Sequence, residues 1–126
     1  MKQLLVPIVT MALFVGIASA QTTCNRNDFE VFEDIACAVD ARNQANAEMN
    51  TAYAALTNRL GPQQKRALKR SQDQWLLFLQ AEVRFIYVME GDGSQGRLEV
   101  ANEEEQQARL RAKALRNWVP QEQGQY

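Results

Sequence analysis

Carboxylates are the side chains in this sequence that come closest to a catalytic arrangement. Asp28, Glu30, Glu33 and Asp34 could supply a general acid and a general base if two of them shared a site. On an amphipathic helix, however, such a cluster is typical of a solvated face. The chain has no histidine, so the commonest general base and transition-metal ligand is missing. It also lacks a Walker loop, a dinucleotide fingerprint and a G-x-S-x-G elbow. We therefore predict that it is not an enzyme and uses no cofactor.

A second group of oxygen ligands has a faint calcium-loop spacing. It consists of Asp92–Ser94 and Glu103. The pattern fails at Gly96, where an oxygen ligand should stand, and at Arg97, where the loop needs glycine. One carboxylate and one hydroxyl do not make a calcium cage, so we predict no metal site.

Charge is segregated along the chain, although 14 Lys and Arg nearly balance 15 Asp and Glu. This balance gives no argument for binding nucleic acid or an anionic membrane. Acidic residues gather at 28–34 and 99–105. Solubility and charge pairs on helix faces explain the segregation most simply, and steering of a cationic partner is the functional alternative. Basic residues gather around a Gly-Pro turn, at Arg59, Lys65, Arg66, Lys69 and Arg70.

The first twenty residues have the pattern of a secretory signal peptide. Lys2 is followed by an apolar run from Leu4 to Ile17 and by Ala18-Ser19-Ala20, a small-residue cleavage site. An uncleaved anchor is the alternative, but the run is short and no stop-transfer charges follow it. A lipoprotein signal would place its cysteine directly at the cleavage point, whereas Cys24 comes later. We predict cleavage after Ala20 and an exported protein, periplasmic or secreted, without a stable membrane anchor.

Export places the two cysteines of the mature chain in an oxidising compartment. Cys24 and Cys37 are then expected to form a disulfide bond rather than to stay free. Closing so short a loop would stabilise the fold by about 3 kcal/mol on the chain-entropy estimate.

Helix formers dominate the mature chain, and no alternating strand pattern of useful length occurs. Apolar residues recur at spacings of three and four over 25–60, with a polar stretch at 42–46 where we expect a bend. Gly61 is expected as a left-handed C-cap and Pro62 as the start of the next helix. The prediction is an all-α, antiparallel bundle of three to four helices over residues 21–119, followed by a polar tail at 120–126.

The segment 62–89 is expected to be the central helix of this bundle. Its apolar stripe predicts Trp75 as the main core anchor and Gln72 as the donor or acceptor of a buried hydrogen bond to a neighbouring helix. Three glycines then predict a loop at 90–96, and the last helix is expected at 97–118.

Four segments, in this order, resemble the motifs of the LprI-type lysozyme-inhibitor domain, a family of small exported bacterial helical proteins. Cys37 with ANAEMNTAY at 45–53 resembles C…A-D-x-x-L-N-x-x-Y, and Leu68 with SQDQW at 71–75 and Phe78 resembles L-x-x-x-Q-x-x-W-x-x-(F/Y). EGDGS at 90–94 is similar to the E-G-G-S loop, and RAKAL at 111–115 to the closing R-x-x-x-L. The residues that carry this structural motif are Asn50, Tyr53, Gln72, Trp75, Gly91, Gly93, Ser94, Arg111 and Leu115.

The chain departs from the family pattern at four positions. A second cysteine pair is usual where Val83 stands and about where Glu103 stands. An arginine is usual at Leu79, and an aspartate at Asn46. The resemblance thus leaves Cys24–Cys37 as the remaining bridge and weakens the transfer of a polar binding surface.

The resemblance implies a non-enzymatic binding protein that blocks lysozyme or another cationic cell-wall hydrolase at the bacterial envelope. The alternative is an envelope interaction module, toxin-neutralising or stress-related, with a non-lysozyme partner. The sequence does not determine the oligomeric state. The acidic residues expected to contact a partner are Asp92, Glu103, Glu104 and Glu105.

Overall fold

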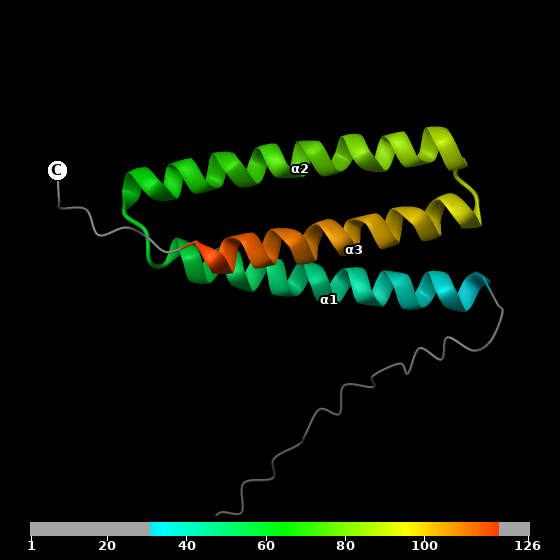
Figure 1. Cartoon of the computed structure of the whole chain (residues 1–126), viewed down its shortest axis with the longest axis horizontal. Helices are drawn as coiled ribbons and strands as arrows, with labels where there is room; N and C mark the ends of the chain where they lie inside the picture. The colour runs from blue at the N-terminus through cyan, green and yellow to red at the C-terminus, as the bar shows by residue number, and fades with distance from the viewer. Residues whose placement is uncertain (1–30, 119–126) are drawn as a thin grey trace, which may run out of the picture.

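The computed structural model describes residues 31–118, which form three helices and, within this range, no strand. These are α1 (Val31–Thr57), α2 (Pro62–Glu90) and α3 (Ser94–Asn117). They run antiparallel in sequence order, as expected from their short connections (Figure 1). The predicted all-α bundle is confirmed. The predicted signal peptide, Cys24 and the C-terminal tail lie outside the described residues.

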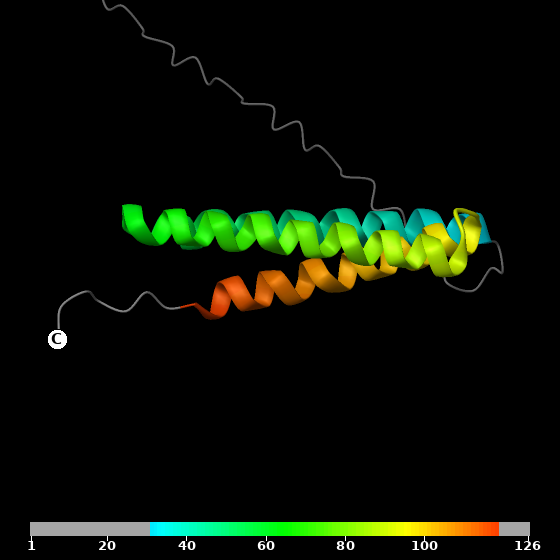
Figure 2. The ribbon, with the colours of Figure 1, turned by 90° about the horizontal axis from the view of Figure 1, so that it is seen from above.

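The core lies mainly between α1 and α3, which pack along most of their length, whereas α2 packs less extensively on α3 and least on α1. In Figure 1 α3 runs between the other two helices, and in Figure 2 it lies to one side of them. Ala38, Ala45 and Ala52 recur every seven residues on α1, and Ala101 and Ala108 do so on α3; all five are buried. Side chains this small allow two helix backbones to approach closely.

The predicted bend near residues 42–46 is wrong, because α1 is continuous from Val31 to Thr57. Two contacts with α3 account for this. Ala45 is completely buried. Arg42 Nη1 lies 3.2 Å from Oε2 of Glu104, and both side chains are partly shielded from solvent. Tertiary packing therefore keeps helical a stretch that looks polar on every side in the sequence.

The expectation that 62–89 is the central core helix is also wrong. α2 contributes no fully buried residue, and α3 takes the central place instead. Trp75 is half-buried, and together with Leu68 it packs against a core cluster supplied by the other two helices. That cluster consists of Met49, Ala52, Leu56, Ala112 and Leu115. Bulky side chains at this contact keep α2 farther from its neighbours than the alanine-lined helices are from each other.

The two turns differ from their predicted forms in detail. Gly61 has φ −76° and serves as the N-cap of α2 rather than as a left-handed C-cap, while Pro62 opens the helix as predicted. The α2–α3 turn is only Gly91–Gly93, and Gly91 adopts a positive φ of 77°. Gly96, expected in the loop, is buried in the first turn of α3 against the carbonyl group of Gly91. Helix α3 therefore starts earlier than the glycine pattern predicts.

Candidate functional site

Arg111 on α3 joins the three helices through a small polar network. Its Nε donates a hydrogen bond to Oε1 of Gln72 (2.9 Å), and its Nη2 donates one to the hydroxyl oxygen of Ser71 (3.0 Å). Nε2 of Gln72 in turn lies 3.5 Å from Sδ of Met49 on α1. Partial burial lowers the pKa of Arg111 from its ordinary value, but a guanidinium stays charged at any physiological pH. The predicted hydrogen bond of Gln72 to a neighbouring helix is present, although Gln72 is half-buried rather than buried.

Other residues of the family motif surround this network or form the turn at the opposite end. Leu115 is buried in the core cluster, with Tyr53 and Trp75 packed against it. Gly91 and Gly93 lie in the α2–α3 turn, and Ser94 is the first residue of α3. These residues hold the helices in place, and none of them forms a site for chemistry.

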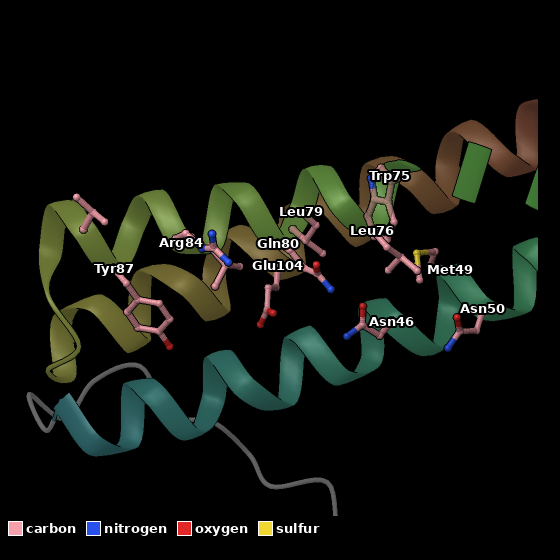
Figure 3. A pocket seen from close by; sticks show the side chains of 12 residues that line it. Asn46, Met49, Asn50, Trp75, Leu76, Leu79, Gln80, Arg84, Tyr87 and Glu104 are labelled. Atoms are coloured by element: carbon pink, nitrogen blue, oxygen red, sulfur yellow. The ribbon is translucent and has the colours of Figure 1, made fainter. Parts of the chain in front are cut away.

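An open groove of about 840 Å³ runs between α1 and α2 (Figure 3). One wall is supplied by α2 and is largely apolar; the other, from α1, combines a methionine with two amides. Figure 3 shows Tyr87 and Trp75 near opposite ends of the α2 wall, with the amides of Asn46 and Asn50 on α1 toward the Trp75 end. The groove is therefore an apolar channel with hydrogen-bonding groups on one side. Its lining comprises Asn46, Met49 and Asn50 from α1, Trp75, Leu76, Leu79, Gln80, Val83, Arg84, Tyr87 and Val88 from α2, and Glu104 from α3.

Two charged side chains project into the groove. Glu104 approaches from α3, and its carboxylate is already paired with Arg42. Arg84 lines the groove from α2 and is exposed. Pairing with Arg42 leaves Glu104 little uncompensated charge, whereas Arg84 adds one cation to a lining that is otherwise mostly apolar or amide.

The C-terminal half of α2 exposes large apolar side chains outside the side that packs on the bundle. Val88 is 76% exposed and Phe85 58% exposed. Large apolar side chains are normally buried, yet these face solvent because only one side of α2 meets the bundle. The exposed large apolar residues of α2 are Leu76, Leu77, Phe78, Phe85, Tyr87, Val88 and Met89. The sequence feature that could have indicated this exposed surface is the segment from Trp75 to Met89. It contains more apolar residues than one face of a helix can hold.

The carboxylates predicted to contact a partner are not brought together. Asp92 is exposed in the α2–α3 turn, whereas the three glutamates stand midway along α3. Glu103 accepts a hydrogen bond from Gln107 (2.8 Å), and Glu105 accepts one from Arg109 (2.9 Å). The latter bond raises the pKa of Arg109. Only Glu104 lines the groove, so a role of these residues in partner contact stays a prediction.

Charge changes sign along the bundle. The exposed cations around the α1–α2 turn are here called the basic end; the C-terminal end of α3 lies at the same end of the bundle (Figure 1). The acidic end comprises the carboxylates near the α2–α3 turn, among which Arg84 and Arg97 also stand. The basic end consists of Arg59, Lys65, Arg66, Lys69, Arg70, Lys113 and Arg116, and the acidic end of Glu82, Glu90, Asp92, Glu99 and Glu103.

Two kinds of feature were not found in the described part of the chain. Within 31–118, no group of three or more His, Cys, Asp or Glu side chains is placed to hold a metal ion. In the same range no helix combines the length and apolar character needed to cross a bilayer. Cys37 is half-buried on α1, and its predicted bond to Cys24 stays a prediction because Cys24 lies outside the described residues.

The fold and the groove define a small helical-bundle protein with an exposed apolar surface, the architecture of a binding protein. Comparison with family models identifies the match: residues 24–115 fit the family described as Lysozyme inhibitor LprI. The chain belongs to this family. A search of curated proteins and a search of solved structures each found no match.

Proposed function

We propose that this chain is an exported, non-enzymatic protein that binds and blocks lysozyme or a similar cationic cell-wall hydrolase. The observation that carries the proposal is membership of the lysozyme-inhibitor family over residues 24–115. The open apolar groove supports it, because specific protein contacts are centred on apolar pockets from which water is excluded.

The groove suits insertion of a protein segment better than binding of a small polar molecule. It is long and open, and Leu76, Leu79 and Tyr87 present one apolar wall. Asn46 and Asn50 on the facing wall can bond to backbone groups of an inserted loop. A hydrolase bound through an inserted loop can have its substrate cleft covered by this chain. Inhibition then needs no catalytic group from this chain.

The acidic end gives a physical basis for meeting a cationic enzyme. The exposed apolar part of α2 lies in the same half of the molecule as the acidic end. Complementary charge steers encounter and adds salt dependence, while apolar burial supplies most of the affinity. We therefore expect association to be fastest at low ionic strength.

The test is a lysozyme turbidity assay with purified residues 21–126. We expect inhibition at micromolar excess and low salt, weakening as salt is added. Leu76→Arg should abolish inhibition by placing a cation at the groove. Leu110→Arg is the matched control, since Leu110 is an exposed leucine of α3 that does not line the groove. Absence of inhibition by the folded wild-type chain at low salt would contradict the proposal.

A second candidate, an envelope module with a non-lysozyme partner, is favoured by one observation. Leu79 and Val83, which replace the arginine and cysteine usual in the family, both line the groove. The groove wall is therefore more apolar here than the family pattern implies, which favours a different partner surface. Capture from periplasmic extract of one stable non-lysozyme partner, lost on Leu76→Arg and kept on Leu110→Arg, would establish this function.

Export and the Cys24–Cys37 bond are part of the proposal and have a separate test. Mass spectrometry of the exported protein, with and without reductant, should give the mass of residues 21–126 and a gain of two hydrogens on reduction. A mass that includes residues 1–20, or one that reductant leaves unchanged, would contradict the corresponding part.

A further inference from the structure

The cations of the basic end are mostly unpaired, although positive and negative charge nearly balance over the whole chain. Within 49–81 and within 106–118, Asp73 is the only acidic residue. Its carboxylate lies 2.8 Å from Nζ of Lys69. Among the residues that the structure describes, none of the other cations of the basic end forms an ion pair. Their positive charge is therefore available to an anionic partner.

These cations come from α2, α3 and the α1–α2 turn, and they gather within a short distance along the bundle axis. On α2 they occupy residues 65–70, which lie within about 12 Å of the start of the helix at a rise of about 1.5 Å per residue. Arg59 lies in the α1–α2 turn, and Lys113 and Arg116 lie in the last two turns of α3 (Figure 1). Cations arranged around one end form a broad surface, whereas a protein that follows a single strand of nucleic acid uses a groove.

An exposed tryptophan stands at the same end of the bundle. Trp118 is the C-cap residue of α3, and it is 66% exposed. An indole combines an apolar ring with an N–H donor, and tryptophan is enriched where membranes meet water. A large aromatic side chain left in solvent beside unpaired cations fits a phospholipid surface better than a small soluble anion.

We propose that the basic end binds the surface of an anionic phospholipid bilayer, with its cations on the headgroup phosphates and the ring of Trp118 at the interface. Each lysine or arginine held near such a surface strengthens binding about fivefold. Contact of this kind is peripheral and reversible. The choice of phospholipid over nucleic acid rests on the proposed export, which brings the chain to the bacterial envelope.

The opposite end of the bundle is unsuited to this contact. The exposed apolar part of α2 lies among the carboxylates of the acidic end, which an anionic surface repels. The bundle therefore stands end-on, with the acidic end pointing away from the bilayer. On α2 the groove begins at Trp75, beyond the cations at 65–70, so it stays open to a second partner. The inference does not depend on what the groove binds.

Co-sedimentation of residues 21–126 with phospholipid vesicles tests the proposal. We expect binding to phosphatidylcholine vesicles that contain phosphatidylglycerol and little binding to phosphatidylcholine alone. Added salt should weaken the binding because it screens exposed charges. The double variant Arg66→Gln/Arg70→Gln should lower the partition coefficient about thirtyfold, from two losses of about fivefold each.

The matched control removes the same charge from the acidic end. Arg84→Gln/Arg97→Gln should change the partition coefficient less than about twofold, because these positions lie far beyond the Debye length of about 10 Å at 0.1 M salt. Circular dichroism of both double variants establishes that they are folded.

Tryptophan fluorescence tests the contact of Trp118 with the bilayer. Anionic vesicles should shift the emission of the wild type to shorter wavelength, and Trp118→Phe should remove the shift, since Trp75 packs on the core cluster. A shift that survives Trp118→Phe, no binding to anionic vesicles at low salt, or equal binding to neutral vesicles would overturn the proposal. So would equal losses in the two double variants. Tighter binding of a single-stranded oligonucleotide than of vesicles would also overturn it, by assigning the basic end to nucleic acid.

Discussion

Replacing Gly96 with alanine sets two physical effects against each other. Gly96 is the third residue of α3, and alanine in a helix is favoured over glycine by about 1 kcal/mol. However, the added Cβ would collide with the carbonyl oxygen of Gly91 and come within 3.7 Å of the ring of Tyr87. The obstacle is backbone, and it belongs to a residue whose N–H already donates to the carbonyl of Tyr87 (3.0 Å).

Relieving this collision requires either opening the α2–α3 turn or shifting α3 along α1. Overpacking of this kind typically costs about 1–3 kcal/mol, and more where backbone must move. Since the propensity gain is smaller than this cost, we expect a net loss of about 2 kcal/mol in the free energy of unfolding. In a domain of this size that loss lowers the melting temperature by roughly 10 °C.

Urea and thermal unfolding followed by circular dichroism measure the effect. Gly93→Ala is the control within the same turn, because Gly93 has φ −72° and a Cβ there would meet no atom within 4 Å. Its replacement should change stability by less than about 1 kcal/mol, through the weaker N-cap preference of alanine. A Gly96→Ala protein as stable as the wild type, or more stable, would refute the close approach on which this reasoning rests.

Three further substitutions test the packing of the bundle. Arg111→Lys should cost about 1–2 kcal/mol, because lysine keeps the charge but cannot reach both partners on α2; a double-mutant cycle with Gln72→Ala should show coupling, and additive effects would contradict the network. Ala108→Leu should lower the free energy of unfolding in urea by about 1–3 kcal/mol or more, because Ala108 is completely buried. Ala54→Leu, at an exposed site, should change it by no more than about 0.5 kcal/mol. Equal changes would show that the α1–α3 contact is looser than described. Trp75→Ala should cost about 2–3 kcal/mol, less than a fully buried tryptophan because one side is exposed; an unchanged melting temperature would mean that Trp75 does not anchor α2.

The helices were predictable because their signals are local. Apolar spacing, helix propensity and the breaks at Pro62 and Gly91 placed α2 within a residue of its observed ends. The sequence could not exclude the bend expected in α1, because the two features that account for a continuous helix, burial of Ala45 and the ion pair of Arg42 with Glu104, arise from packing against α3. Local pattern reading does not detect a charge pair formed between two helices.

The motif residues were predictable, whereas the groove was not. Gln72 and Arg111 were identified through their resemblance to the family motif, and they do meet in the structure. The groove depends on which helices stay apart, and its walls come from segments about 30 residues apart. Apolar content led us to place α2 at the centre of the bundle, although a run of apolar residues does not determine whether anything covers it.

The sequence by itself determined the helices, their antiparallel order and the family to which the chain belongs. These follow from interactions between near neighbours and from motif spacing, which are written directly in the chain. Only the tertiary structure decided that α1 and α3 form the tight pair and that α2 lies partly detached. The physical reason is side-chain size at the contacts, because alanines let two helices come together, whereas Trp75 and Leu68 hold the third at a distance and leave its apolar sides exposed.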